Sequence, residues 1–388
     1  MKSTPGPSSA SARLGAHIPE LDGIRAVAVW MVLCAHLLYG GPTPKATLNV
    51  IPKFVGFVFG HGWLGVDLFF VLSGFLITGI LLDSRDKPGY FRNFYARRFL
   101  RIIPLYFAVV LVCWPFYPET SKYFLLSLLF LANFAYAFGA AVPHGPGVFW
   151  SLAIEEHFYL VWPWLVRYLT RRALTVTAIG LVVVIPVLRF WAVSAGMNPR
   201  VQIYNYSFFR FDGLALGALM AIWVRSAWAN RRTSLWLSAA LVGASVVVTL
   251  AGIPFGVLSE ASVLRYTQAQ LVFAGFLVAV VALKGTGVTA PLRWPFAKLS
   301  GDLSYCIYLT HLSISDGYQH LLQKVGIDPL AAFGPLGLLV VRAIAILGCT
   351  FGIALLSRRF LERPVLRLKR YFEYGSAHGL RAAVSRQP

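Results

Sequence analysis

Charged and imidazole side chains recur inside long apolar stretches of this chain. Arg25 and His36 share one such stretch and are eleven residues apart, so a helix places them on one face, about 16 Å apart along its axis. An imidazole can accept the proton of an attacking hydroxyl group, and a carboxylate bound to its other nitrogen stabilises the imidazolium. Ionisable groups inside hydrocarbon are costly and usually face a cavity or a partner. The other candidates of this kind are Asp67, Glu155, Glu156, Arg210, Asp212 and His311.

Composition predicts the environment of these groups. The chain has 388 residues, of which 57% are hydrophobic and 13% charged, about half the charged fraction of soluble domains. Apolar stretches of about 17–22 residues recur, and each is long enough to cross hydrocarbon. The net charge of +20 comes from Lys and Arg residues clustered between these stretches, which is typical of membrane topology rather than of nucleic-acid binding. We predict an all-α integral membrane protein with a lipid bilayer, and no nucleic acid, as partner.

The positions of the basic residues also predict the topology. Segment 123–139 is short and polar in places, and if it crossed the membrane every later loop would change side and the excess of Lys and Arg on the cytoplasmic side would collapse. We therefore expect an interfacial or re-entrant segment there, on the outer side, and both termini in the cytoplasm. The ten predicted spans are 24–41, 61–82, 102–118, 148–166, 173–195, 208–224, 234–253, 267–283, 298–319 and 335–357.

The predicted domain organisation is simple. A polar N-terminal tail, 1–19, shows no signal-peptide pattern, the membrane domain covers 20–371, and 372–388 is a loose polar tail. The four cysteines lie in apolar stretches without metal-type spacing, so we expect no metal site. The expected location is the cell (inner) membrane, as a multi-pass protein.

With this topology the ionisable groups of separate spans lie at a similar depth near the outer side. We therefore expect one buried site in which Asp67, Glu155 or Glu156 orients His36. The two glutamates are adjacent, about 100° apart on a helix, so at most one of them faces His36. Ser73 is expected to be a helix-packing residue rather than a nucleophile.

A basic run lies at the opposite, cytoplasmic side. It contains Arg92, Arg97, Arg98 and Arg101, interleaved with tyrosine and phenylalanine. Such a surface can bind a phosphorylated, nucleotide-bearing donor through charge and ring stacking. The charge alone is also what positive-inside topology requires.

Seven segments in order along the chain resemble the acyltransferase-3 family of membrane O-acyltransferases. They are PELDGIRAVAVWMVLCAH (19–36), GHGWLGVDLFFVLSGFLIT (60–78), YARRFLRIIPLYF (95–107), FWSLAIEEHFYLVWP (149–163), FRFDGLALGAL (209–219), LSYCIYLTH (303–311) and FLERP (360–364).

The resemblance implies an activity and roles for individual residues. It implies acyl-CoA, most commonly acetyl-CoA, as a cytoplasmic co-substrate, no permanently bound cofactor, and a sugar or other hydroxyl compound of the cell envelope as acceptor. His36 is then the essential catalytic residue, with Asp67, Glu155 and Glu156 beside it. Some relatives carry a further extracytoplasmic domain, and because this chain ends sooner we expect the membrane part to act alone. Donor contacts are expected from Arg25, Arg97, Arg98 and Arg101, and acceptor contacts from Trp150, Ser151, Tyr159, Arg210, Asp212 and His311.

Two questions stay open at this level. The acyl group can pass directly to the acceptor or through an acyl-histidine. A multi-span transporter or flippase for a sugar, lipid or small molecule is the alternative function, because a layer of intramembrane charges also suits a proton relay. The sequence shows no pair of interrupted half-repeats of the kind found in many transporters. The oligomeric state is not predicted.

Overall fold

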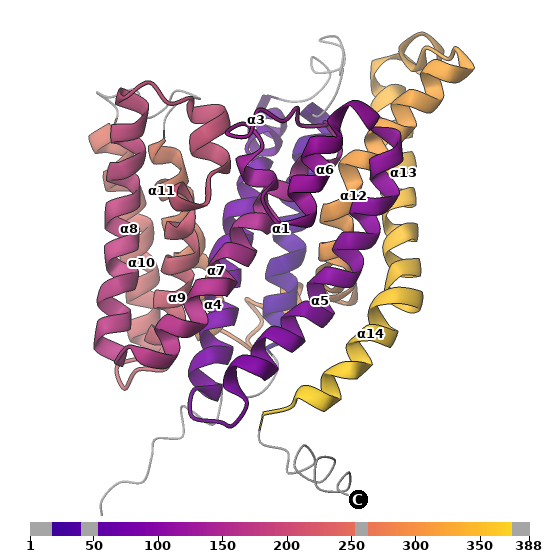
Figure 1. Cartoon of the computed structure of the whole chain (residues 1–388). Coiled ribbons are helices and arrows are strands. Elements are labelled where there is room, and N and C mark those ends of the chain that lie inside the picture. The colour runs from indigo at the N-terminus through magenta and orange to yellow at the C-terminus, as the bar shows by residue number, and fades with distance from the viewer. Residues whose placement is uncertain (1–17, 40–52, 253–262, 375–388) are drawn as a thin grey trace, which may run out of the picture.

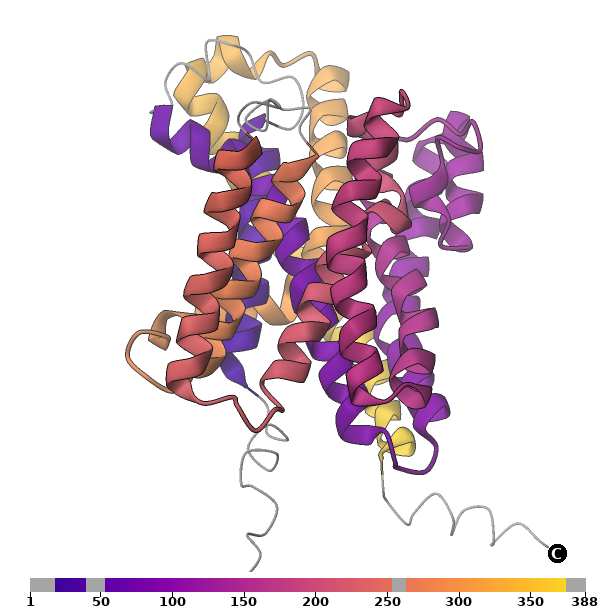
Figure 2. The same ribbon diagram turned by 90° about the vertical axis from the view of Figure 1, so that its left-hand side faces the viewer.

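The computed structural model describes residues 18–39, 53–252 and 263–374, and in these residues every regular element is a helix. Long helices stand side by side in one bundle (Figures 1 and 2). Each of the ten predicted spans overlaps one helix. These are α1 (Pro19–Tyr39), α4 (Gly65–Ser84), α5 (Tyr90–Cys113), α7 (Phe149–Tyr168), α8 (Arg171–Ser194), α9 (Phe211–Trp223), α10 (Arg231–Gly252), α11 (Leu264–Ala282), α12 (Pro295–Val325) and α13 (Pro329–Ser357).

Six of the described segments are long and apolar enough to cross a membrane. The prediction of a multi-span, all-helical membrane protein is confirmed at this level, and the count of ten spans stays a prediction. The α9 helix overlaps a predicted span, but its 13 residues extend only about 20 Å, less than the roughly 30 Å of a hydrocarbon core. The six segments are Lys53–Ser84, Tyr90–Phe116, Arg171–Ser194, Arg231–Gly252, Leu264–Ala282 and Gly334–Phe372.

The segment 123–139 does not form a long helix. It contains the end of α6 (Ser121–Leu128), eight residues long, followed by a 3-10 turn at Ala132–Phe134. Eight helical residues extend about 12 Å, far less than the roughly 30 Å of a hydrocarbon core. The α6 helix lies near the end of the bundle drawn at the top of Figure 1, as expected for a segment that does not cross.

Both ends of the described chain lie at the same end of the bundle. Residues near the start of α1 and residues after α13, including the short helix α14 (Arg363–Arg367), line one cavity at the end drawn at the bottom of Figure 1. The predicted tails lie largely outside the described residues, since 1–17 and 375–388 are not described. The assignment of this lower end to the cytoplasm stays a prediction.

Helix α4 lies inside the bundle and packs against α1, α7, α9 and α11. Its closest neighbour is α9, and glycine makes that approach feasible. A Cβ atom on Gly74 would collide with the carbonyl oxygen of Leu214, and one on Gly217 with the carbonyl oxygen of Val71. The two backbones therefore touch, which holds the ends of α4 and α9 that carry Asp67 and Arg210 in a defined relation.

Candidate active site

His36 lies opposite a second histidine. Its Nδ1 is 3.0 Å from Nε2 of His311 on α12, which packs along α1. The other nitrogen of His311, Nδ1, is 2.8 Å from the carbonyl oxygen of Tyr308. The structure thus gives Nδ1 of His36 a histidine partner where a carboxylate was expected, and Asp67 and Glu155 bond other side chains. A catalytic role of these carboxylates stays a prediction.

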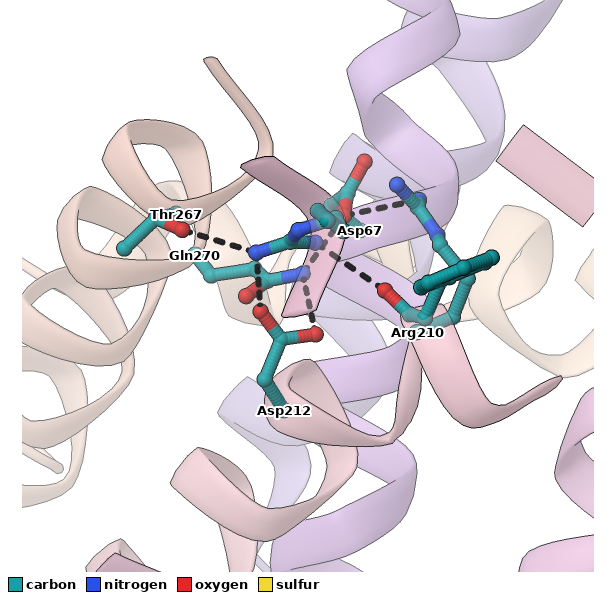
Figure 3. Close-up of polar contacts among 7 residues, drawn as sticks. Asp67, Arg210, Asp212, Thr267 and Gln270 are labelled. Carbon is teal, nitrogen blue, oxygen red and sulfur yellow. Dashed lines mark hydrogen bonds and ion pairs between the residues drawn. The ribbon is translucent and has the colours of Figure 1, made fainter. Parts of the chain in front are cut away.

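Asp67 belongs to a buried ion-pair network (Figure 3). Its Oδ1 accepts hydrogen bonds from Arg210, at 2.9 Å, and from Gln270, at 3.1 Å. Gln270 also donates a hydrogen bond to Asp212, at 3.3 Å. Asp212 in turn forms an ion pair with Arg189, at 2.5 Å. Two arginines and two aspartates, none more than 2% exposed, thus neutralise one another between α4, α8, α9 and α11.

None of these four charged residues lines the internal cavity beside Glu155 or the basic cavity at the lower end of the bundle. The Arg210 guanidinium lies 4.3 Å from the ring centre of Tyr266 and 6.0 Å from that of Trp150. Asp67, Arg210, Asp212 and Trp150 are therefore buried behind the candidate site rather than in it, and the catalytic or substrate-binding roles expected for them gain no support. Arg189 was identifiable in the sequence only as a lone arginine inside a predicted span.

Glu155 faces an internal cavity of about 120 Å³. One carboxylate oxygen accepts a 2.7 Å hydrogen bond from the Ser73 hydroxyl, and the other accepts a 3.0 Å hydrogen bond from the Tyr159 hydroxyl. Ser73 thus contacts the carboxylate as well as contributing to helix packing. Glu156 is on another face of α7, and its Oε1 is buried without a hydrogen-bond partner.

Below the internal cavity, a basic vestibule opens at the lower end of the bundle. Arg25, Leu76, Arg98 and Arg101 line both spaces, so the two are contiguous. The vestibule lining contains seven basic and three acidic residues, and Arg97 is among the basic ones. The full set of its charged residues is Arg25, Arg97, Arg98, Arg101, Arg358, Arg363, Lys369, Asp22, Asp302 and Glu362.

At its other end the internal cavity reaches Tyr308. The Tyr308 hydroxyl lies 2.7 Å from the Ser151 hydroxyl, and both residues line the cavity. The Tyr308 ring centre is 5.9 Å from that of His311. The histidine pair therefore lies just beyond the cavity wall, and the vestibule, the cavity and the pair follow one another along the bundle.

A third histidine lies near the pair at the upper end. His144, in the loop before α7, bonds the Asp316 carboxylate at 2.6 Å, and Tyr117 donates to the other oxygen of Asp316 at 2.8 Å. The hydrogen bond to Asp316 raises the pKa of His144, against opposing effects of partial burial and of Arg342. Nothing in the spacing of these three residues predicted their contact. In the described residues no cluster of three or more His, Cys, Asp or Glu side chains suits a metal ion.

Comparison with known proteins identifies the class. Residues 18–358 match the family model described as an acyltransferase domain, and the chain therefore belongs to that acyltransferase family. Similar proteins include the peptidoglycan O-acetyltransferase OatA of Listeria monocytogenes, 30% identical over 90% of this chain and 56% of the relative. The O-acetyltransferase OatA of Staphylococcus aureus is 26% identical over 77% of this chain and 50% of the relative.

The chain thus spans about half the length of the curated relatives it matches. No solved structure matches it significantly.

Proposed function

We propose that this protein is a membrane O-acyltransferase that transfers an acetyl group from acetyl-CoA to a hydroxyl group of a cell-envelope carbohydrate. Family membership and the names of the relatives support the reaction class and the carbohydrate acceptor. The observation that carries the proposal is the order of the spaces: a basic vestibule opens past three arginines into a cavity that ends beside the His36–His311 pair.

The vestibule suits the phosphates of coenzyme A. Guanidinium groups bind phosphate oxygens through strong, charge-assisted hydrogen bonds, and Arg98 and Arg101 lie at the entrance of the internal cavity. The apolar walls of that cavity, among them Leu72 and Leu76, suit the acyl-bearing arm. In this proposal the lower end of the bundle is cytoplasmic.

The proposed chemistry takes place above Tyr308. His36 accepts the proton of the acceptor hydroxyl while its oxygen attacks the thioester carbonyl carbon. The carbon–sulfur bond breaks, the acetyl group stays on the oxygen as an ester, and the thiolate leaves with the proton that His36 returns. A direct transfer is the simplest route, and it requires the acceptor to reach His36 from the upper, outer end.

The transporter alternative is less favoured. The chain belongs to an acyltransferase family, and the buried charges of Asp67 and Asp212 are paired with arginines and shielded from solvent.

The test is transfer by the purified full chain in lipid nanodiscs. Radiolabelled acetyl-CoA is supplied with a panel of hydroxyl acceptors that includes cell-wall glycan fragments, and the product is an alkali-labile labelled ester. The His36→Ala variant is expected to form no ester. Arg98→Ala and Arg101→Ala are each expected to raise KM for acetyl-CoA about tenfold, whereas Arg232→Ala, exposed on α10 outside the vestibule, leaves it unchanged. Movement of acceptor across liposomes without ester, or normal transfer by His36→Ala, contradicts the proposal.

A further inference from the structure

The contacts of His311 determine where its proton lies. A neutral imidazole carries one N–H donor and one nitrogen acceptor. Nδ1 of His311 lies 2.8 Å from the carbonyl oxygen of Tyr308 and 3.2 Å from that of Ile307. Carbonyl oxygens only accept hydrogen bonds, so Nδ1 is the protonated nitrogen. Nε2 of the neutral His311 ring therefore presents a lone pair.

The proton position of His36 follows from the same contact. Nε2 of His311 is 3.0 Å from Nδ1 of His36, and since Nε2 can only accept, Nδ1 of His36 donates. The remaining nitrogen of His36, Nε2, is then unprotonated. Nε2–H is the tautomer that a free imidazole prefers in water, so the contact selects the less common form.

We propose that His311 is a positioning residue that holds His36 in the tautomer whose free Nε2 acts as the base. This inference deepens the proposed function and rests on it only for the activity measurements below. His311 takes the place that a carboxylate occupies in many hydrolases. It is itself fixed, because it is only 2% exposed and both of its ring nitrogens are bound.

The same geometry favours a positioning role over the acceptor contact expected for His311 from the sequence. A residue that binds the acceptor needs an unoccupied donor or acceptor, and in this structure neither ring nitrogen of His311 is available. When His36 accepts a proton on Nε2, its Nδ1–H contact with His311 becomes a charge-assisted hydrogen bond, which is about twice as strong as a neutral one. The pair therefore stabilises the imidazolium that the reaction forms.

Two substitutions separate positioning from simple space filling. His311→Leu retains bulk and removes the acceptor for His36, whereas His311→Gln retains a side-chain oxygen that can accept from Nδ1 of His36. We expect His311→Leu to lower kcat about 100-fold with KM for acetyl-CoA within about twofold, and His311→Gln to retain at least about a tenth of kcat. His157→Leu, which removes a partly buried histidine that is bonded to Ser207 at 2.6 Å, is the control and leaves kcat of the folded protein unchanged.

A spectroscopic measurement tests the tautomer of His36 without an activity assay. ¹⁵N NMR of the histidine-labelled full chain in nanodiscs distinguishes protonated from unprotonated ring nitrogens, and His36→Ala assigns the His36 signals. The expected wild-type signals are a protonated Nδ1 and an unprotonated Nε2, and His311→Leu shifts the population toward protonated Nε2.

The kinetic and the NMR results can contradict different parts of this account. A wild-type His36 protonated on Nε2 overturns the inference, whatever the activity. Equal kcat losses in His311→Leu and His311→Gln, or no loss in His311→Leu, overturn the positioning role. A wild-type protein with the expected NMR signals but no ester product overturns the proposed function and leaves the histidine contact established.

Discussion

At the scale of single residues, the ionisable side chains inside the bundle form two groups, an ion-pair network around Asp67 and the histidine pair. Asp67 and Arg210 form an ion pair at 2.9 Å with no exposure to solvent, which stabilises the bundle only while both are present. His36 instead contacts the His311 ring through Nδ1, and in the proposed tautomer its Nε2 is left available for chemistry. Chemical type alone does not separate these groups, because aspartate, glutamate, arginine and histidine are all suited to a catalytic site.

Removing one member of the ion-pair network should destabilise the fold. Asp67→Ala leaves the Arg210 guanidinium buried and uncompensated, which is expected to lower the free energy of unfolding by about 3–5 kcal/mol. The double variant Asp67→Ala/Arg210→Met removes both charges and is expected to be more stable than the single variant. Chemical denaturation of the purified proteins in detergent measures both. A single variant as stable as the wild type would show that the network contributes nothing.

At the scale of helices, close backbone approach defines the geometry between α4 and α9. Gly217→Ala places a methyl group against the carbonyl oxygen of Val71. Because this oxygen belongs to the backbone of α4, it cannot move by itself, and the two helices must shift apart. We expect a loss of more than about 2 kcal/mol in unfolding free energy. Gly243→Ala on α10, where an added Cβ meets no atom within 4 Å, is the matched control and should be neutral or slightly stabilising. Equal effects of the two substitutions on the melting temperature would contradict this account of the helix pair.

The Asp316 carboxylate joins three separate parts of the upper end, α12, Tyr117 after α5 and His144 before α7. Because the contact raises the pKa of His144, its stabilisation is complete below the unfolded pKa of about 6.5 and is lost as pH rises through the folded pKa. His144 is 52% exposed, so solvent screening limits the effect to less than about 1 kcal/mol.

Melting curves from pH 6 to pH 8.5 test this contact. The wild type should lose a small amount of stability across the range, and His144→Gln should abolish that particular loss. His61→Gln, also at the upper end but bonded only to the Phe57 carbonyl, should keep it. A stability that rises with pH in the wild type and falls in His144→Gln would reverse the sign and reject the role of Asp316.

At the scale of the whole molecule, the functional spaces lie along the bundle rather than on one element. The vestibule collects residues from α1, α4, α5, α12 and the segment after α13, and it narrows to the internal cavity near Leu76. In the proposed function, this arrangement would bring a charged, water-soluble donor from one end of the bundle to the histidine pair deep inside it. The excess of basic over acidic side chains around the vestibule attracts anions.

Blocking the narrow region should stop the donor. Leu76→Trp fills space shared by the vestibule and the cavity, so kcat/KM for acetyl-CoA is expected to fall at least about tenfold, and further for longer acyl chains. Leu160→Trp, at a position on α7 that is 63% exposed, adds the same ring on the outer surface and should have no effect. Full activity of Leu76→Trp would place the donor path elsewhere.

Much of this protein was predictable from local sequence. Apolar stretches of spanning length predicted the helices because hydrocarbon requires every backbone polar group to be satisfied within its own segment. The seven motifs predicted the family, which the family model confirms. Arg98 and Arg101 are one helical turn apart on α5, so their common surface needed no knowledge of other helices.

The partner of His36 was not predictable in this way. Loop charges indicated which side chains share a depth, and they carry no information about the rotation of each helix about its own axis. A rotation of about 100° exchanges one residue for its neighbour on the facing surface. Only the packing of α12 along α1, and the close approach of α4 and α9, decided that His311 rather than Asp67 faces His36. Contacts between residues 275 positions apart depend on how whole helix surfaces fit together.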